Sequence, residues 1–413
     1  MPAPPVSIAV VGCGPGGTSL VERLCANAAV LLKGRRLHLH VIDPYPPGAG
    51  RIWRSEQSPL LWANSLASHI TVFTDASSTC EGPIRPGPSV WEWGRDRAAE
   101  LRAGRLAADL LPYADELARI TPFWFPSRPL LSAYLEWAFR HTVATAPPNV
   151  RVAVYRDHAV DITDAPEKAP AAPPGAPPRQ HIELAGGARI TVDAVVLSQG
   201  HGDTDPTPDE RRLAAHAARD RLVYLPRGYT ADLDLDALRP GEPVLARGIG
   251  LAFIDLMVRV TAERGGRFVR DADGTLAYRP SGREPVLLAA SRRGVPYRAK
   301  IGYELTGDAT PVPHFLTVDA FADRPGPGAL EFDRDIRPLL DREMTWAYYH
   351  RLCTAHPERT ALTWDTFATR YTALTDPARS AHRDRHPAAE PPETAGEIAA
   401  LIARAVPDPA CVL

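Results

Sequence analysis

The sequence predicts an α/β fold in which two units, each of a strand, a glycine turn and a helix, are followed by a mainly helical segment. The first unit runs from an apolar strand at 7–11 through a glycine turn at 12–17 into an apolar helical stripe. The second runs from a strand at 243–246 through a glycine turn at 248–250 into an apolar helix at 251–260. Units of this kind build parallel sheets that are covered by helices.

The first glycine turn has the spacing that a bound pyrophosphate requires. Residues 12–17 read Gly-Cys-Gly-Pro-Gly-Gly and match the pattern Gly-x-Gly-x-x-Gly. A turn without side chains lets the backbone approach the anion, and the start of the following helix points N–H groups at it. The alternative is a glycine-rich turn with a purely structural role. We expect a dinucleotide to contact Gly12, Gly14, Pro15, Gly16 and Gly17.

The next predicted strand, at 37–42, ends in an acid. Asp43 follows it directly, and its carboxylate can accept hydrogen bonds from the ribose of an adenosine. Asp43 lies 29 residues after Gly14, whereas the usual interval is about 20, so we expect a longer or irregular helix between them. Strand, glycine turn, helix and terminal acid in this order predict a Rossmann-like dinucleotide-binding domain.

A long loop and two helices are predicted after this acid. The stretch 44–88 is rich in proline and glycine, and a long loop in this position usually covers a ligand. Apolar residues at helical spacing predict helices at 95–118 and 127–142, and alternation predicts a strand at 149–155. We expect both helices to pack on a sheet.

The first domain is predicted to end soon after a buried strand at 193–197. An uninterrupted apolar run is typical of a strand that is buried on both faces, and a hairpin at 181–192 precedes it. The insert 165–179 consists almost entirely of proline, alanine, glycine and charged residues, which predicts disorder. We expect a first domain at 1–203, a second at 204–330 and a helical segment at 331–413.

The second glycine turn departs from the first in its sequence. Gly248 and Gly250 are present, but Phe253 stands where a small residue is usual, so an ordinary turn between strand and helix is the alternative. After the next predicted strand, Arg292 and Arg293 occupy the place of the ribose-binding acid. Two guanidinium groups there suit a 2′-phosphate and would select NADPH over NADH, unless they form a solvated surface pair.

Composition and charge exclude several classes of protein. The 413 residues carry 47 basic and 49 acidic side chains without a block of like charge, so neither nucleic acid nor a membrane surface is an expected partner. The five cysteines lack the spacings of zinc sites, disulfide frameworks or redox dithiols, and no apolar stretch is long enough to span a bilayer. We therefore expect a cytoplasmic protein of two or three domains without a bound metal, which acts on small molecules.

Two further blocks of sequence carry a family resemblance. Residues 41–54 read Val-Ile-Asp-Pro-Tyr-Pro-Pro-Gly-Ala-Gly-Arg-Ile-Trp-Arg, and a second block at 64–75 is followed by Gly-Pro at 82–83. With the glycine turn, these blocks make the chain resemble the bacterial family of FAD/NAD(P)-binding proteins, which is similar to flavin-containing and N-hydroxylating monooxygenases. The resemblance extends to about residue 320 and implies that the first domain binds FAD and the second NADPH.

The resemblance also implies roles for residues outside the glycine turns. The residues that would contact the cofactors there are Gly50, Arg51, Trp53, Asn64, Arg128 and Gly200. Asn64 matches an asparagine that lies near the flavin ring, where an uncharged amide could hydrogen-bond both the nicotinamide and an oxygen-derived group. Asn64 is therefore the expected catalytic residue. Its alternative role is that of a loop asparagine that satisfies local backbone groups.

The activity that the resemblance implies is that of an FAD-dependent NAD(P)H oxidoreductase, most simply a monooxygenase acting on a small molecule. Hydride would pass from the nicotinamide to the flavin, and electrons would pass from the reduced flavin to oxygen. One alternative is a flavin reductase or dehydrogenase that does not activate oxygen. Another is a non-catalytic sensor or partner subunit that holds FAD without turnover.

Overall fold

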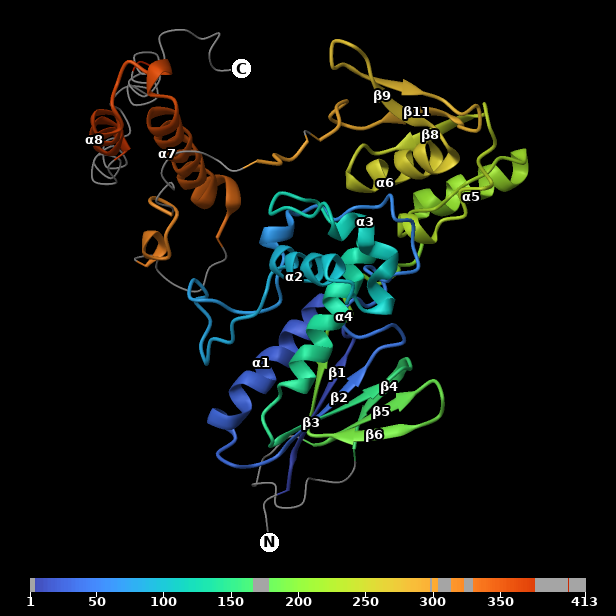
Figure 1. Cartoon of the computed structure of the whole chain (residues 1–413), viewed down its shortest axis with the longest axis vertical. Coiled ribbons are helices and arrows are strands. Elements are labelled where there is room, and N and C mark those ends of the chain that lie inside the picture. The colour runs from blue at the N-terminus through green and yellow to red at the C-terminus, as the bar shows by residue number, and fades with distance from the viewer. Residues whose placement is uncertain are drawn as a thin grey trace. The chain divides into compact units, whose positions relative to one another are not determined.

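The structure, a computed structural model, describes residues 4–165, 178–297, 299–303, 313–322 and 330–375, together with Ala400. The chain divides into two compact units, Met1–Gly302 and Tyr303–Leu413 (Figure 1). Both glycine turns belong to the first unit, in which we call residues 4–203 the first module and 204–302 the second module. The predicted domain boundaries near 203 and 330 stay predictions.

The first module is built on a four-stranded parallel sheet, in agreement with the predicted α/β class. The strands lie in the order β3-β2-β1-β7, and β1 pairs with β2 on one side and with β7 on the other. The strands expected at 7–11, 37–42 and 149–155 are all confirmed. Their bounds are Val6–Val11 for β1, Leu37–Ile42 for β2, Val150–Tyr155 for β3 and Ala194–Leu197 for β7.

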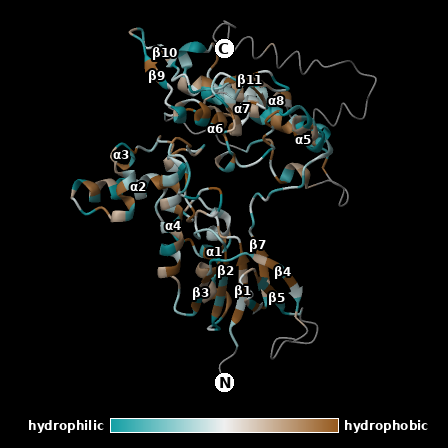
Figure 2. Ribbon diagram, turned by 90° about the vertical axis from the view of Figure 1, so that its right-hand side faces the viewer, coloured by the Kyte–Doolittle hydropathy of each residue, from teal (hydrophilic) through white to brown (hydrophobic). Residues whose placement is uncertain are grey.

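Different layers cover the two faces of this sheet, as Figures 1 and 2 show. Helices α1 (Pro15–Leu31) and α4 (Arg128–Ala144) pack on one face. The antiparallel sheet of β4 (Ala159–Asp164), β5 (Gln180–Leu184) and β6 (Arg189–Val192) packs on the other. Because side chains alternate along a strand, Val10 faces the helices while Ala9 and Val11 face the second sheet. Both faces of the central strand are thus buried, as in other parallel sheets.

The long helix expected at 95–118 is wrong. The chain forms α2 (Val90–Arg102), then the 3-10 helix η2 (Ala108–Tyr113), and finally the short α3 (Ala114–Leu117). Helix α2 ends where Gly104 takes a φ of +68°, and Pro112 lies inside η2. A glycine in the left-handed conformation ends a helix, and proline cannot continue one. The helix is therefore interrupted, although the apolar residues keep helical spacing.

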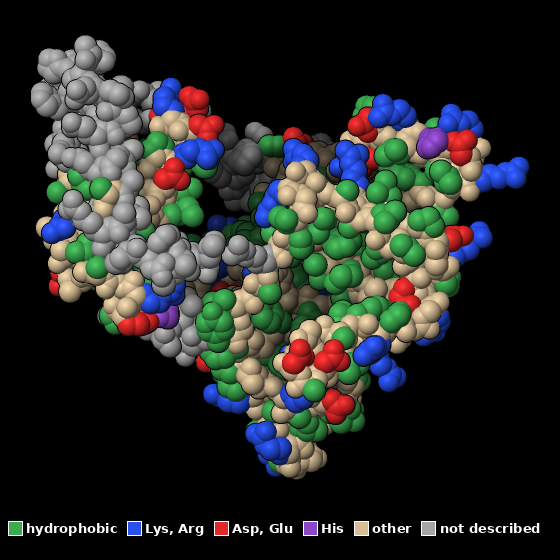
Figure 3. Space-filling view, turned by 90° about the horizontal axis from the view of Figure 1, so that it is seen from above, with side chains coloured by type: hydrophobic (Ala, Val, Ile, Leu, Met, Phe, Trp, Pro, Cys, Tyr) green, Lys and Arg blue, Asp and Glu red, His purple; other side chains and the backbone are tan. Residues whose placement is uncertain are grey.

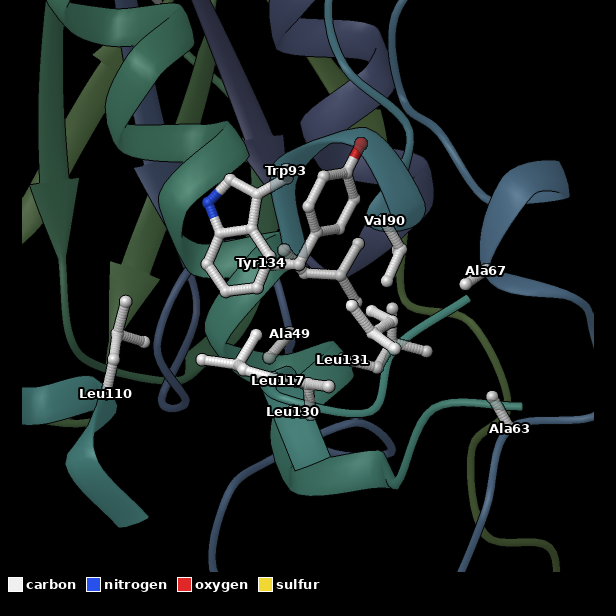
Figure 4. Close-up of a cluster of buried hydrophobic side chains, with 12 residues drawn as sticks. Ala49, Ala63, Ala67, Val90, Trp93, Leu110, Leu117, Leu130, Leu131 and Tyr134 are labelled. Carbon is white, nitrogen blue, oxygen red and sulfur yellow. The ribbon is translucent and has the colours of Figure 1, made fainter. Parts of the chain in front are cut away.

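A second core lies between α2, α3, α4 and the loop that follows Asp43 (Figure 4). The rings of Trp93 and Tyr134 meet edge to face with their centroids 5.8 Å apart. Helix α2 therefore packs on other helices and on the loop, not on the sheet as expected. Helix α4 contributes Leu130 and Leu131 to this core and Phe139 to the core beneath the sheet. It thereby ties the loop to the sheet.

The expectation that the strand at 193–197 is buried on both faces is also wrong. Val196 and Leu197 are 36% and 58% exposed, and β1 is the only strand that pairs with β7 among the described residues. The apolar run predicted a central strand, but it forms an edge. The disordered insert predicted at 165–179 falls mainly on 166–177, outside the described residues. At its ends, Ala165 N–H donates to the carbonyl of Arg179 at 2.6 Å and prolongs the pairing of β4 with β5.

The second module repeats the order of strand, glycine turn and helix on a smaller sheet. Strand β8 (Pro243–Arg247) leads into α6 (Leu251–Val260), and β11 (Val286–Ala290) pairs with β8 in parallel. Helix α5 (Pro208–Asp220) precedes this unit, and the hairpin of β9 (Arg267–Arg270) and β10 (Leu276–Arg279) lies inside it. Leu245, Val286 and Leu288 remain 76%, 51% and 53% exposed, and hydrophobic side chains gather on the right-hand side of Figure 3.

The described part of the second unit is helical. Helices α7 (Arg337–Ala355) and α8 (Trp364–Thr375) enclose an aromatic core of Trp346, Tyr349 and Phe367. Within the described ranges, no helix in either unit combines the length and apolar character that crossing a bilayer requires. The same ranges hold no group of three potential metal ligands.

Candidate functional site

The first glycine turn joins β1 to α1 and has no room for side chains. Gly12 has a φ of +88°, and a Cβ atom there would lie 2.4 Å from the carbonyl oxygen of Ser198. A Cβ atom on Gly17 would lie 2.4 Å from the carbonyl oxygen of Gly12. Backbone atoms cannot be displaced as easily as the end of a side chain, so both positions require glycine.

The start of α1 is not capped by a side chain. Gly14 is the N-cap residue, Pro15 occupies the first helical position, and the first turn contains no acid. The first N–H groups of a helix have no acceptor within the helix, and the positive end of the helix dipole lies there. Donors and field together form a site for an anion such as pyrophosphate.

Two other segments enclose this turn at the carboxyl edge of the sheet. Gly48 N–H donates to the carbonyl of Cys13 at 2.7 Å, and a Cβ atom on Gly50 would lie 2.9 Å from Cα of Gly14. Ser198 extends β7 and contacts the turn from the other side. Open parallel sheets bind ligands at this edge.

Asp43 lies at the end of β2, as predicted, and also holds the glycine turn in place. One carboxylate oxygen accepts the N–H of Cys13 at 2.6 Å, and the other accepts the N–H of Tyr45 at 2.8 Å. Burial raises the pKa of Asp43, and the two N–H donors partly oppose that shift. Each carboxylate oxygen has two lone pairs, so the same group can still accept ribose hydroxyls.

The cysteine within the turn is unsuited to nucleophilic chemistry. Cys13 is fully buried, and burial raises its pKa to about 12. The thiolate is the reactive form of cysteine, so a thiol with this pKa is inert near neutral pH. Cys13 therefore packs beneath the turn.

The second glycine turn is open. Gly248 has a φ of +108°, and no atom of the described residues lies within 4 Å of a Cβ built there, while Gly250 is the N-cap residue of α6. Gly248 N–H donates to the carbonyl of Ala290, the last residue of β11, at 2.7 Å. The turn and the end of β11 therefore share the carboxyl edge of the small sheet.

Arg292 and Arg293 follow β11 and lie at this same edge. Both are exposed, and neither forms an ion pair with another residue of the described part of the chain. The guanidinium carbon of Arg293 lies 5.0 Å from the ring centre of Tyr297. The structure thus brings the predicted arginine pair beside the second glycine turn, with its charge available to a ligand.

Comparison with known proteins identifies the segment that holds the first turn. A model of the FAD-NAD(P)-binding family matches residues 9–202. Residues 9–202 are therefore similar to the FAD-NAD(P)-binding family. The match spans the parallel sheet of the first module, from β1 to the end of β7.

Longer relatives extend the likeness into the second module. The L-aspartate N-monooxygenase (nitrosuccinate-forming) of Streptomyces davaonensis is 42% identical over 353 residues, which are 84% of this chain and 53% of the relative. Nitrosuccinic acid synthase npaA of Aspergillus oryzae is 41% identical over 355 residues, 84% of this chain and 50% of the relative. The chain thus spans about half the length of these curated relatives. Among solved structures, the lysine monooxygenase NbtG of Nocardia farcinica aligns with a TM-score of 0.32 at 14% identity, over 62% of this chain and 55% of that one.

Within residues 9–202, the loop after Gly50 contains an arginine that forms ion pairs with two carboxylates. Arg51 lies 3.0 Å from a carboxylate oxygen of Asp203 and 3.1 Å from one of Asp232. Trp53 is half-buried at the rim of the second core. Contacts of Arg51 and Trp53 with a cofactor stay predictions.

Arg128 is the first residue of α4 and reaches into the second module. Its guanidinium group lies 2.5 Å from the Asp255 carboxylate and donates to the Tyr229 hydroxyl at 2.8 Å. The same group lies 5.9 Å from the ring centre of Trp53. Arg128 and Trp53, both predicted near flavin, are therefore neighbours.

Asn64 and Gly200 are the most open of the predicted residues. The Asn64 side chain is exposed, and its backbone carbonyl accepts a hydrogen bond from Nζ of Lys300 at 2.6 Å. Gly200 has a φ of +65° and no atom within 4 Å of a Cβ built there. The roles of both residues toward a cofactor remain predictions.

Sequence reasoning missed Tyr229, Asp232 and Asp255. Asp255, on α6, forms an ion pair with Arg128. One signal was available, because a cation in the first turn of a helix opposes the helix dipole and needs an acid from elsewhere. Which acid supplies it depends on how the two modules pack, and no local pattern records that.

Proposed function

We propose that this chain is an FAD-dependent, NADPH-using monooxygenase that hydroxylates the amino group of a small amino acid. The observation that carries the proposal is the enclosed glycine turn of the first module. Its backbone leaves no space for side chains, it lies at an uncapped helix start, and Asp43 stands beside it. This proposal makes both modules Rossmann-like dinucleotide-binding domains.

The first module suits FAD. Gly12, Gly14 and Gly17 would hold the pyrophosphate at the start of α1, and Asp43 would accept the ribose hydroxyls. Gly50 would close over the pyrophosphate from the opposite side. When bound, FAD supplies a hydride acceptor and passes electrons to oxygen. The protein's own work is to bind, orient and exclude water.

The second module suits NADPH. Gly248 and Gly250 would admit the pyrophosphate at the start of α6, and Arg292 with Arg293 would bind the 2′-phosphate. A guanidinium fork matches a phosphate better than a point charge does. NADPH is therefore the proposed electron donor.

L-Aspartate is the first substrate to test, because two relatives that are 42% and 40% identical across most of this chain carry the name L-aspartate N-monooxygenase. In the first oxidation, the amine, O₂, NADPH and a proton give the hydroxylamine, water and NADP⁺. The nitrogen lone pair forms the N–O bond, so the amine must be unprotonated when it reacts. Asn64 is the proposed catalytic residue, whose amide would donate a hydrogen bond to the oxygen-derived group.

The decisive experiment combines a spectrum with an assay of the full chain. Purified protein loaded with FAD should show oxidised-flavin absorption, lose it with NADPH without air, and convert L-aspartate in air to a product heavier by one oxygen. NADPH oxidation that yields only hydrogen peroxide would favour the reductase. A flavin that NADPH cannot bleach would favour the non-catalytic protein.

Asn64→Asp tests the catalytic residue within that assay. The variant should keep FAD, because the side chain is exposed and supports no described core. We expect NADPH oxidation to continue while product falls about 10- to 1,000-fold and peroxide rises, since a carboxylate cannot donate the amide hydrogen bond. Unchanged coupling between NADPH and product would remove Asn64 from the mechanism.

A further inference from the structure

A polar seam joins the two modules of the first unit. The seam consists of Arg51, Arg54 and Arg128 from the first module and Tyr229, Asp232 and Asp255 from the second. All six side chains belong to one compact unit. The family resemblance implies cofactor contacts for Arg51 and Arg128, but it assigns no role to Tyr229, Asp232 or Asp255.

Asp232 receives two guanidinium groups at once. Arg51 lies 3.1 Å from one of its oxygens, and Arg54 hydrogen-bonds the other. Burial tends to raise the pKa of Asp232, but the hydrogen bonds from the two arginines lower it overall. The carboxylate therefore stays ionised and holds both ends of the short loop 51–54.

The ion pair of Arg128 with Asp255 is less exposed than the ion pairs of Asp232 with Arg51 and Arg54. We therefore expect Arg128 to depend on its acid more strongly than Arg51 and Arg54 depend on theirs. The side chains of Arg128 and Asp255 are 12% and 16% exposed, and Arg128 lies where the dipole of α4 disfavours a cation. Its Nε atom is buried and has no hydrogen-bond partner among the residues that the structure describes. Removing one partner from such a pair leaves a buried charge without compensation, which is strongly unfavourable.

Tyr229 fills the space between the arginines. Its ring centre lies 5.7 Å from the guanidinium carbon of Arg54 and 5.5 Å from that of Arg128. The hydroxyl lies 2.6 Å from the carbonyl oxygen of Ile52, an acceptor in the same loop. Burial raises the pKa of Tyr229, so the hydroxyl keeps the proton that it donates.

The seam is separated from each of the two glycine turns by only a few residues. Arg51 directly follows Gly50, which covers the first turn. Asp255 lies on α6, little more than one helical turn after Gly250, the N-cap residue of the second turn. A displacement of the seam would therefore move one turn relative to the other.

We propose that Asp232 and Asp255 are positioning residues, which hold the nicotinamide-binding module at the orientation that hydride transfer to flavin requires. They act through Arg51, Arg54 and Arg128. This inference rests on the proposed function, because it assigns FAD to one turn and NADPH to the other. Hydride transfer needs its two atoms within about 3–3.5 Å, so a small change in module orientation has a large effect on rate.

Anaerobic mixing of the FAD-loaded chain with NADPH tests the proposal. Asp255→Asn keeps the shape of the side chain and removes its charge, and we expect flavin reduction by NADPH to slow about 10- to 100-fold. FAD content, the Kd for NADPH and reduction by dithionite should stay unchanged, because neither glycine turn is altered. Asp255→Glu should recover part of the rate.

Asp209→Asn is the matched control. Asp209 belongs to the second module, is exposed, and pairs only with Arg212 on its own helix among the described residues. The control should reduce at the wild-type rate. A wild-type rate in Asp255→Asn would overturn the proposal, and so would slowing that accompanies loss of FAD. If Asp255→Asn does not fold, Asp232→Asn makes the same test at a more exposed acid.

A second readout does not depend on activity. Amide hydrogen exchange of the peptides at 50–57 and 229–233 should increase in Asp232→Asn and stay unchanged in Asp209→Asn. Equal exchange in both variants would contradict the proposal that the seam restrains the two modules. If NADPH fails to reduce the wild-type flavin while exchange responds as expected, the proposed function fails and the restraint between the modules stands.

Discussion

The two glycine turns of the first unit have related sequences but different surroundings. At the first turn, Cβ atoms on Gly12 and Gly17 would lie 2.4 Å from backbone oxygens. At the second, a Cβ atom on Gly248 meets nothing within 4 Å. The first turn lies on a four-stranded sheet with both faces covered, the second on a two-stranded sheet with exposed apolar residues.

The difference teaches that one motif can need glycine for two separate reasons. At Gly12 both the positive φ and the neighbouring backbone exclude a side chain, whereas at Gly248 only the positive φ of +108° does. A turn enclosed by protein is already shaped for its ligand. An open turn depends on the ligand and on neighbouring segments for its final shape.

The largest expected effect is that of Gly12→Ala. The substitution adds backbone strain and a clash with the Ser198 carbonyl, so we expect the free energy of unfolding to fall by about 3 kcal/mol or more, with loss of bound flavin. Urea denaturation followed by circular dichroism measures it. Gly34→Ala is the control, since Gly34 has a φ of +85° and open space around it. An equal loss in both variants would show that the enclosure of the first turn contributes nothing.

The next effect concerns the arginine pair beside the second turn. Replacing both Arg292 and Arg293 with alanine should weaken NADPH binding about 10- to 100-fold and leave NADH binding nearly unchanged, because only NADPH carries a 2′-phosphate. Titration of the FAD-loaded chain with each nucleotide measures this. Arg267 and Arg270, exposed on β9, give a matched double-alanine control. Equal weakening toward NADPH and NADH would contradict the assignment.

Gly248→Ala should have a smaller effect than Gly12→Ala. It introduces strain at a positive φ but no steric clash, so the free energy of unfolding should fall by about 1–2 kcal/mol. FAD content should be unchanged, since the first turn is untouched. A loss as large as that of Gly12→Ala, measured in the same urea series, would mean that the second turn is enclosed as well.

The smallest effect is a pH dependence from Asp43. Burial raises its folded pKa above the ordinary value of 3.8, so the native state binds this proton more tightly than the unfolded state does. The resulting stabilisation is complete below pH 3.8 and is lost as pH rises through the folded pKa. Asp43→Asn removes this contribution, so the difference in unfolding free energy between wild type and variant should change with pH above 3.8. A constant difference across that window would contradict the raised pKa.

Local sequence patterns predicted the strands, turn and helix of the site correctly, but they predicted the helix at 95–118 and the burial of β7 incorrectly. Strand, turn, helix and acid at 7–43 are all where the sequence placed them, and Ser127 caps α4 through its hydroxyl as the start of that helix requires. The prediction of one helix at 95–118 was wrong because Gly104 and Pro112 end the helical backbone, although the apolar spacing of the sequence continues past them. The prediction that β7 is buried on both faces was wrong, because apolar composition does not distinguish a central strand from an edge strand.

The sequence by itself determined the α/β class, the glycine turn at 12–17, the acid at Asp43 and the arginine pair at 292–293, because each depends on residues close together in the chain. Only the tertiary structure decided that Ser198 and Gly50 enclose the first turn, and that Arg128 meets Asp255 across 127 residues. Backbone preferences act over a few residues, and the sequence records them directly. Contacts between distant segments depend on how whole elements pack, and that information is spread over every core residue of the unit.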